Sequence, residues 1–167
     1  MSNNLQTADL PPSWQQQHQK ESEEQLSLLQ SISRELAGAS DLSSALQIVL
    51  RRVCEKTDWA VGVAWVPSTD GSELICDSSW VNQNGQAGHF QAGSANTRFK
   101  PGVGLPGRVW QSKTPAWVDD VTVDSNFPRL AAAQTSGLKT GAAIPILSGE
   151  DVIAVVEFFM RGTREHN

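Results

Sequence analysis

The segment Lys100-Pro101-Gly102-Val103-Gly104-Leu105-Pro106-Gly107-Arg108-Val109-Trp110 decides which fold the chain is expected to adopt. Its three glycines match the letters G-x-G-x-x-G of a dinucleotide-binding loop. In such a loop the glycines follow a buried parallel strand and open a long helix. Here the preceding residues 96–101 are polar and end in a proline, and Lys113-Thr114-Pro115 ends the following helix after barely two turns. This context argues against a phosphate-binding loop.

The segments on either side of this glycine-rich stretch predict hairpins. Four longer strands are expected in two pairs, at residues 59–66 with 73–81 and at residues 138–147 with 151–160. Residues 115–118 fit a brief edge strand, because a proline at the start of an edge strand removes no ladder hydrogen bond. Sequential hairpins imply antiparallel pairing. We therefore expect an α+β fold, with a mainly antiparallel central sheet of about six strands and helices packed on its faces.

Helical periodicity predicts the remaining elements of this region. Apolar residues recur on one face of a helix that ends near Thr57, and Ser40-Asp41 offers its N-cap. A short helix begins at Pro106, and another is capped by Ser125 or Asn126 and closed by Gly137. Residues 82–96 contain a single large apolar residue, so we expect a mobile loop there.

The N-terminal part of the chain has a different character. Residues 1–20 are polar and rich in Asn and Gln, which predicts a disordered lead-in. Residues 21–38 show apolar side chains at intervals of three and four, which predicts an amphipathic helix ended by Gly38. Residues 39–167 form the expected globular domain. In the strand at 73–81, Leu74, Cys76 and Trp80 are expected on one side of the sheet.

Several segments, in the same order, resemble the GAF domains of bacterial and cyanobacterial multi-sensor signalling proteins of the histidine kinase type. The resemblance runs from about Leu42 to Met160 and is carried by Gly102 to Trp110, Pro115 to Val118, Asp124 to Arg129, Gly141 to Ile146 and Val155 to Phe159. The apolar stripe of the helix at residues 21–38 leaves two alternatives, packing on its own domain or packing against the same helix of a second chain. The resemblance implies a GAF-like sensory domain at residues 39–167 and, for the preceding helix, the homodimer. It also implies that the chain is an N-terminal fragment of a longer protein of a two-component system.

Composition limits the classes of partner. The net charge is −5 and the pI is about 5.1, so nothing electrostatic favours DNA or RNA. No apolar run is long enough to span a bilayer, and the N-terminus has no targeting pattern, so we expect a cytoplasmic protein that does not bind membranes. The three histidines have no second candidate ligand nearby, and no metal site is expected.

The residues also argue against catalysis. No nucleophile, base or metal set is apparent, and Cys54 and Cys76 do not resemble the loop cysteines of GAF proteins that reduce free methionine sulfoxide. The helix that carries the attachment cysteine in cyanobacterial photoreceptors corresponds to residues 127–133, which contain no cysteine, so no covalent bilin is expected. Noncovalent bilin binding stays open. Of the signature of cyclic-nucleotide GAF domains, Asn126-Phe127 is present, whereas the lysine and the acidic pair are missing. A cyclic nucleotide is therefore a minor alternative.

By resemblance, a small-molecule ligand of unknown identity would lie between the sheet and the short helices. The expected ligand-binding residues are Trp80, Phe99, Leu105, Trp117, Phe127, Arg129, Ala142, Ile144 and Glu157. For the apolar members, plain core packing is the alternative. Arg129 would ordinarily be a solvated surface residue. Strand alternation places Glu157 beside Val155 and Phe159, where a carboxylate must pair, hydrogen-bond or stay protonated. A structural ion pair or a backbone hydrogen bond is favoured over a ligand contact.

These observations predict a non-catalytic regulatory GAF sensor domain. It would bind a small molecule, relay a conformational change through flanking helices, or do both. A ligand-free dimerisation module is the alternative, and a noncovalent bilin photosensor is the second alternative.

Overall fold

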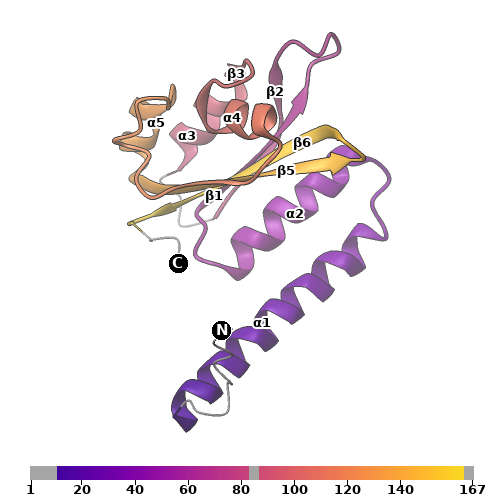
Figure 1. Ribbon diagram of the computed structural model, residues 1–167, viewed down its shortest axis with the longest axis vertical. Coiled ribbons are helices and arrows are strands. Elements are labelled where there is room, and N and C mark those ends of the chain that lie inside the picture. Colours follow the sequence, from indigo (N-terminus) through magenta and orange to yellow (C-terminus); the bar gives the residue numbers. More distant parts are fainter. Residues whose placement is uncertain (1–10, 83–86, 164–167) are drawn as a thin grey trace, which may run out of the picture. The chain divides into compact units, whose positions relative to one another are not determined.

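The structure is a computed structural model that describes residues 11–82 and 87–163 (Figure 1). It contains two compact units, which divide between Gly38 and Ala39. The described part of the first unit contains one long helix, and that of the second contains one sheet with helices.

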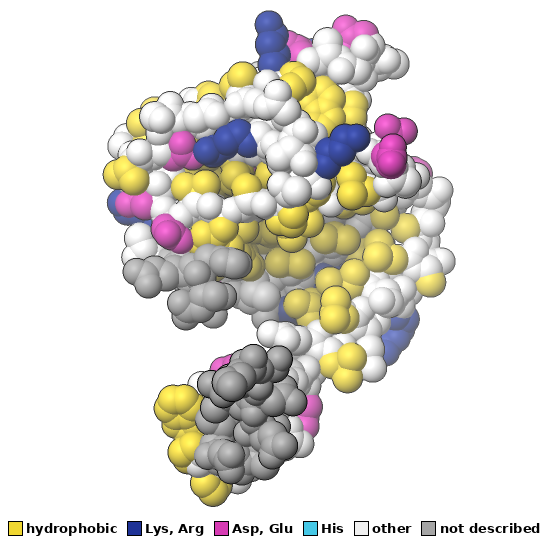
Figure 2. Space-filling view, in the orientation of Figure 1, with side chains coloured by type: hydrophobic (Ala, Val, Ile, Leu, Met, Phe, Trp, Pro, Cys, Tyr) yellow, Lys and Arg dark blue, Asp and Glu magenta, His cyan; other side chains and the backbone are white. Residues whose placement is uncertain are grey.

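The helix of the first unit, α1, spans Pro12–Leu36 and so begins earlier than predicted. Residues 12–20, expected to be disordered, are helical, whereas residues 1–10 of the expected lead-in lie outside the described residues. Two features favour the early start. Pro12 stands at the first helical position, where no N–H is needed, and glutamine side chains donate to Glu21 and Glu23 one turn later. Hydrophobic side chains lie on the surface of this unit (Figure 2), and Leu29 is 62% exposed.

The second unit contains a six-stranded sheet with the order β3-β2-β1-β6-β5-β4, in which every neighbouring pair is antiparallel. The strands are β1 (Val61–Pro67), β2 (Leu74–Val81), β3 (Arg98–Phe99), β4 (Ala116–Val118), β5 (Leu138–Ser148) and β6 (Asp151–Arg161). The helices are α2 (Leu42–Lys56), α3 (Gly88–Ala95), α4 (Gly104–Ser112) and α5 (Leu130–Thr135). This confirms the predicted α+β fold with a mainly antiparallel sheet.

Two cores lie on opposite faces of the sheet. Helix α2 covers one face, and α3, α4 and α5 lie over the other (Figure 1). Asp41 caps α2 as predicted, because its carboxylate accepts from Ser44 N at 2.8 Å, and this hydrogen bond lowers the pKa of Asp41. We call these faces the α2 face and the α3–α5 face.

Helix α3 contradicts the prediction of a mobile loop at residues 82–96. Phe90 and Ser94 of this helix are fully buried, whereas residues 83–86 lie outside the described residues. Small residues line the contact between α3 and α5: a Cβ at Gly93 would lie 3.6 Å from Ala132 Cβ, which is an ordinary van der Waals distance. One aromatic side chain on a small-residue helix is therefore enough to anchor the segment.

The glycine-rich stretch forms a tight elbow between the edge strand β3 and α4. Gly102 and Gly104 have φ values of +80° and +65°, which favour glycine. Asn126 holds the elbow in place: its Oδ1 accepts from Gly104 N at 2.8 Å, and its Nδ2 donates to Gly102 O at 3.0 Å. The prediction that Asn126 caps α5 is therefore wrong, because its side chain is used by the elbow and Arg129 precedes α5.

We predict that Gly107→Ala lowers the free energy of unfolding by about 1–3 kcal/mol, as expected for overpacking. A Cβ at this position would lie 2.3 Å from the carbonyl oxygen of Lys100, which is backbone and cannot turn aside. The measurement is the free energy of unfolding in urea. Gly88→Ala is the matched control, because a Cβ there meets no atom within 4 Å and its φ is not positive. Equal stabilities for the two variants would contradict the assigned geometry of the elbow.

Candidate functional site

A buried ion pair lies on the α3–α5 face of the sheet. Glu157 belongs to β6, which lies between β1 and β5, and its side chain is fully buried. Arg129 immediately precedes α5 and is 5% exposed. Nη1 of Arg129 lies 2.5 Å from Oε1 of Glu157, and Nη2 lies 2.9 Å from Oε2. The guanidinium therefore meets both carboxylate oxygens in a bidentate pair.

Two further side chains complete the hydrogen bonding of the pair. Trp65 in β1 donates its indole N–H to Glu157 Oε1 at 2.8 Å. Ser94 in α3 accepts from Arg129 Nη1 at 3.1 Å. Arg129 Nε is buried and has no hydrogen-bond partner among the described residues. Glu157 is thus held by three N–H groups, whereas Arg129 retains a donor that the surrounding chain does not use.

Five aromatic rings surround the guanidinium, and we call them the aromatic box. The distances from Arg129 Cζ to the ring centroids are 4.7 Å for Phe90, 5.0 Å for Phe99, 5.3 Å for Trp65, 5.3 Å for Phe127 and 5.4 Å for Phe159. The rings also pack on one another, with Trp65 and Phe99 edge to face at 4.8 Å. A cation over an aromatic face is stabilised by about 2 kcal/mol or more once water is excluded. The box therefore suits a buried guanidinium.

Burial of the pair does not by itself make the protein more stable. Taking both charges out of water costs several kcal/mol, and replacing such a pair by apolar residues is often neutral or stabilising. Removing one partner, in contrast, leaves an uncompensated charge. The pair therefore fixes which side chains meet on this face more than it adds to the free energy of unfolding.

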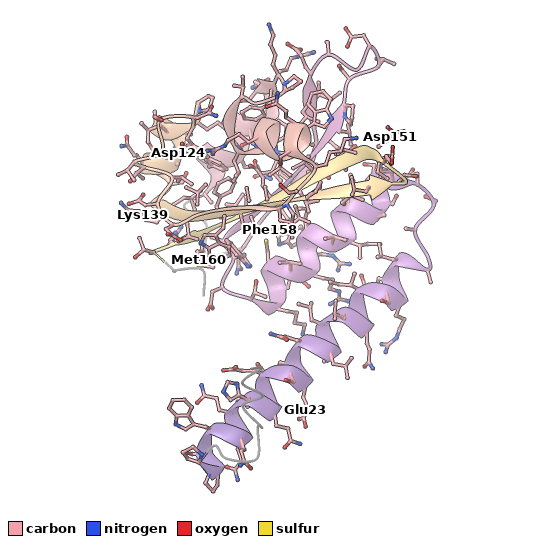
Figure 3. The ribbon with its side chains drawn as sticks, viewed as in Figure 1. Glu23, Asp124, Lys139, Asp151, Phe158 and Met160 are labelled. Atoms are coloured by element: carbon pink, nitrogen blue, oxygen red, sulfur yellow. The ribbon has the colours of Figure 1, made fainter. Side chains whose placement is uncertain are left out.

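The structure divides the nine predicted ligand-binding residues between the two faces of the sheet. Five of them are buried together on the α3–α5 face: Phe99, Leu105, Phe127, Arg129 and Glu157. The other four, Trp80, Trp117, Ala142 and Ile144, do not join this group. Two labelled residues mark these faces in Figure 3. Phe158 belongs to the core on the α2 face, and Asp124 lies near α4 on the α3–α5 face, where it pairs with Arg108.

Strand geometry explains why four predicted residues lie elsewhere. Ala142 pairs with Phe158 and Ile144 pairs with Val156, and both partners belong to the core on the α2 face. Ile144 is 46% exposed. Trp117 pairs with Ala142 and packs edge to face on Trp59, with the ring centroids 5.7 Å apart. The residue of β5 that pairs with Glu157 is Ala143, and not the predicted Ala142.

A β-bulge moves Trp80 to the other face. Ala64 pairs with Ser78 and Trp65 pairs with Cys76, so Asp77 is an extra residue in β2. Leu74 and Cys76 pack in the core on the α3–α5 face, whereas Trp80 packs against the core on the α2 face. The prediction that these three side chains share one side is wrong, because one inserted residue reverses the alternation.

The expectation for Glu157 is confirmed, and that for Arg129 is wrong. Glu157 forms the favoured ion pair, whereas Arg129 is buried and not solvated. Sequence reasoning missed Trp65, Phe90, Ser94 and Phe159 as members of the cluster. A usable signal existed for two of them, because Phe159 shares the face of Glu157 by alternation and Phe90 is the single large apolar residue of its segment.

The two thiols are poor nucleophiles. Burial, with a smaller contribution from Glu55, raises the pKa of Cys54 to about 12. Burial, followed by the negative charges of Glu157 and Asp77, raises the pKa of Cys76 to about 11. Both sulfurs are therefore protonated at neutral pH, whereas nucleophilic chemistry requires the thiolate.

The described residues contain neither a metal-binding cluster nor a membrane-spanning helix. Within residues 11–82 and 87–163, no group of three or more His, Cys, Asp or Glu side chains is placed to hold a metal ion. Over the same residues, no helix combines the length and apolar character needed to cross a membrane.

Comparison with known proteins agrees with the observed topology. The family model described as GAF domain matches residues 39–167, which is more than half of the chain. The chain belongs to the GAF domain family. GAF domains are a family of regulatory sensor domains. A search of curated proteins found no match.

Solved structures support the fold of this GAF domain. The GAF domain of a phosphoenolpyruvate-protein phosphotransferase from Coxiella burnetii has a TM-score of 0.70 and 18% identity, covering 85% of this chain and 80% of that chain. The nlh2 GAF domain of A. aeolicus, solved in an inactive state, has a TM-score of 0.66 and 20% identity, covering 86% and 83%. Free methionine-R-sulfoxide reductase from Neisseria meningitidis, solved with its substrate, has a TM-score of 0.66 and 18% identity, covering 84% and 74%. At these identities the likeness concerns the fold alone.

We predict that Glu157→Gln lowers the free energy of unfolding by about 3–5 kcal/mol, because Arg129 would then be buried without a counter-charge. The double substitution Arg129→Met with Glu157→Leu should restore most of this loss. The measurement is urea denaturation of the wild type, Glu157→Gln and the double variant. Glu73→Gln is the matched control, since its partner Arg98 is 65% exposed and such pairs contribute at most about 1 kcal/mol. A loss of similar size in Glu157→Gln and Glu73→Gln would contradict the buried pair.

Proposed function

We propose that this GAF domain is a non-catalytic sensor of a small molecule, which binds on the α3–α5 face and changes the conformation passed to the flanking helices. The observation that carries the proposal is the pair of Arg129 and Glu157 inside the aromatic box. It brings an incompletely hydrogen-bonded charged group and aromatic walls together between the sheet and the short helices. Ligand sites combine such apolar walls with a few placed polar groups.

A route for the conformational change supports this proposal. Glu157 and Phe158 are neighbours in β6, and they point to opposite faces of the sheet. Phe158 packs tightly near α2: a Cβ at Gly62 would lie 3.0 Å from both Phe158 Cε1 and Leu50 Cδ2. A shift of β6 at Glu157 would therefore press on α2. The helix that precedes α2 in the sequence would receive the signal.

The wider setting of the domain is also a proposal. By resemblance, we place it in a cytoplasmic two-component signalling protein, of the histidine kinase type, that dimerises through α1. Exposed Leu26 and Leu29 on α1 favour such a dimer, because apolar side chains on a helix surface are available to a second copy. The same observation supports the second candidate function, a ligand-free dimerisation module.

A binding survey separates the two candidates. Gently purified protein is analysed by native mass spectrometry, and its melting temperature is measured with a panel of cationic, neutral and anionic small molecules and one linear tetrapyrrole. We expect at least one compound to raise the melting temperature with increasing concentration, because a ligand of the folded state stabilises that state. Binding should weaken several-fold in Phe90→Leu, which removes one wall of the box.

Ile144→Ala is the matched control, because Ile144 lies on the other face of the sheet and is partly exposed. Its affinity for the compound should equal that of the wild type. A protein without adducts and without a thermal response to any compound would rule out the sensor and favour the dimerisation module.

A further inference from the structure

Nε is the one nitrogen of the Arg129 guanidinium that donates to no described residue. An arginine carries five N–H donors. Nη1 donates to Ser94 Oγ and Glu157 Oε1, and Nη2 donates to Glu157 Oε2. Nε has no partner among the described residues, although the side chain is 3% exposed. A buried donor without an acceptor costs about 1–3 kcal/mol, so an acceptor that reached Nε would recover that free energy.

The charge of Arg129 is already compensated. Glu157 meets it in bidentate geometry, and Glu157 in turn accepts from Trp65. An anionic ligand would lose its hydration without finding an unpaired cation, and a cationic ligand would find a carboxylate that already accepts three hydrogen bonds and is paired with Arg129. The unmet requirement at this site is a hydrogen-bond acceptor without net charge.

The walls around Nε determine the shape of a suitable ligand. The rings of the aromatic box come from β1, α3, β3, β6 and the segment before α5, so they enclose the guanidinium from several directions. Flat molecules pack on aromatic rings by stacking or edge-to-face contact, with centroids about 4.5–7 Å apart. A planar molecule is therefore favoured over a compact aliphatic one.

We propose that Arg129 Nε is the hydrogen-bond donor of a site for a neutral, planar small molecule that carries a carbonyl or ring-nitrogen acceptor. The inference rests on the proposed sensor function and narrows its ligand to one chemical class. It disfavours ligands with ionised phosphates, including cyclic nucleotides, at this site.

The test uses three probes that share one ring and differ in charge: benzamide, benzoate and benzylammonium. Binding to the wild-type chain is measured by the melting temperature and by ligand-observed NMR. We expect benzamide to bind at least tenfold more tightly than either charged probe. Arg129→Lys should weaken benzamide binding about tenfold, because lysine keeps a cation for Glu157 but has no Nε–H. Arg98→Lys is the matched control, since the Arg98 side chain is 65% exposed and pairs with Glu73 instead of joining the box.

The order of the three probes on the wild type decides the test even if Arg129→Lys does not fold, and a second variant adds an independent check. Glu157→Gln leaves the guanidinium without its counter-charge, so the preference should reverse and benzoate should bind more tightly than benzamide. Equal or tighter binding of a charged probe to the wild type overturns the inference and leaves the sensor function standing. Failure of all three probes also overturns the inference. Only the absence of any ligand in the broader survey overturns the sensor function as well.

Discussion

The requirement to neutralise a carboxylate in the middle of a central strand governs the arrangement of this domain. Glu157 cannot reach solvent from β6, so a cation must come to it, and Arg129 does so from the start of α5. The guanidinium must in turn be shielded, and the aromatic box provides that shield from five separate segments. Because α3, β3 and the segment before α5 all contribute side chains that surround this ion pair, the three elements are held over the same face of the sheet.

Much of the fold could be predicted because its signals are local. Asp41 caps a helix whose apolar face is continuous, and the hairpin pairs alternate as strands should. The context of the glycine-rich stretch excluded a parallel nucleotide-binding fold. Alternation predicted that Glu157 is buried, since its neighbours two residues away are apolar, and so favoured an ion pair or a backbone hydrogen bond for its carboxylate.

The remainder depends on tertiary contacts that the local pattern does not reveal. The bulge at Asp77 reverses the face of Trp80, and nothing in the local composition marks it. Helix α3 has weak helical character of its own and is held by the burial of Phe90. Arg129 seemed a surface residue, because its partner lies 28 positions away in the sequence. For the same reason the predicted site mixed the two faces of the sheet.

Aromatic rings enclose Arg129, and its Nε–H donates to none of the described residues. The most direct measurement is the ¹H–¹⁵N NMR spectrum of the arginine Nε–H groups in the unliganded protein, with the Arg129 signal assigned from a variant that lacks it. If the rings enclose Arg129, its Nε–H gives a separate resonance that is displaced upfield by ring currents and exchanges slowly with water. A signal at the position of exposed arginines, in rapid exchange with solvent, would contradict it.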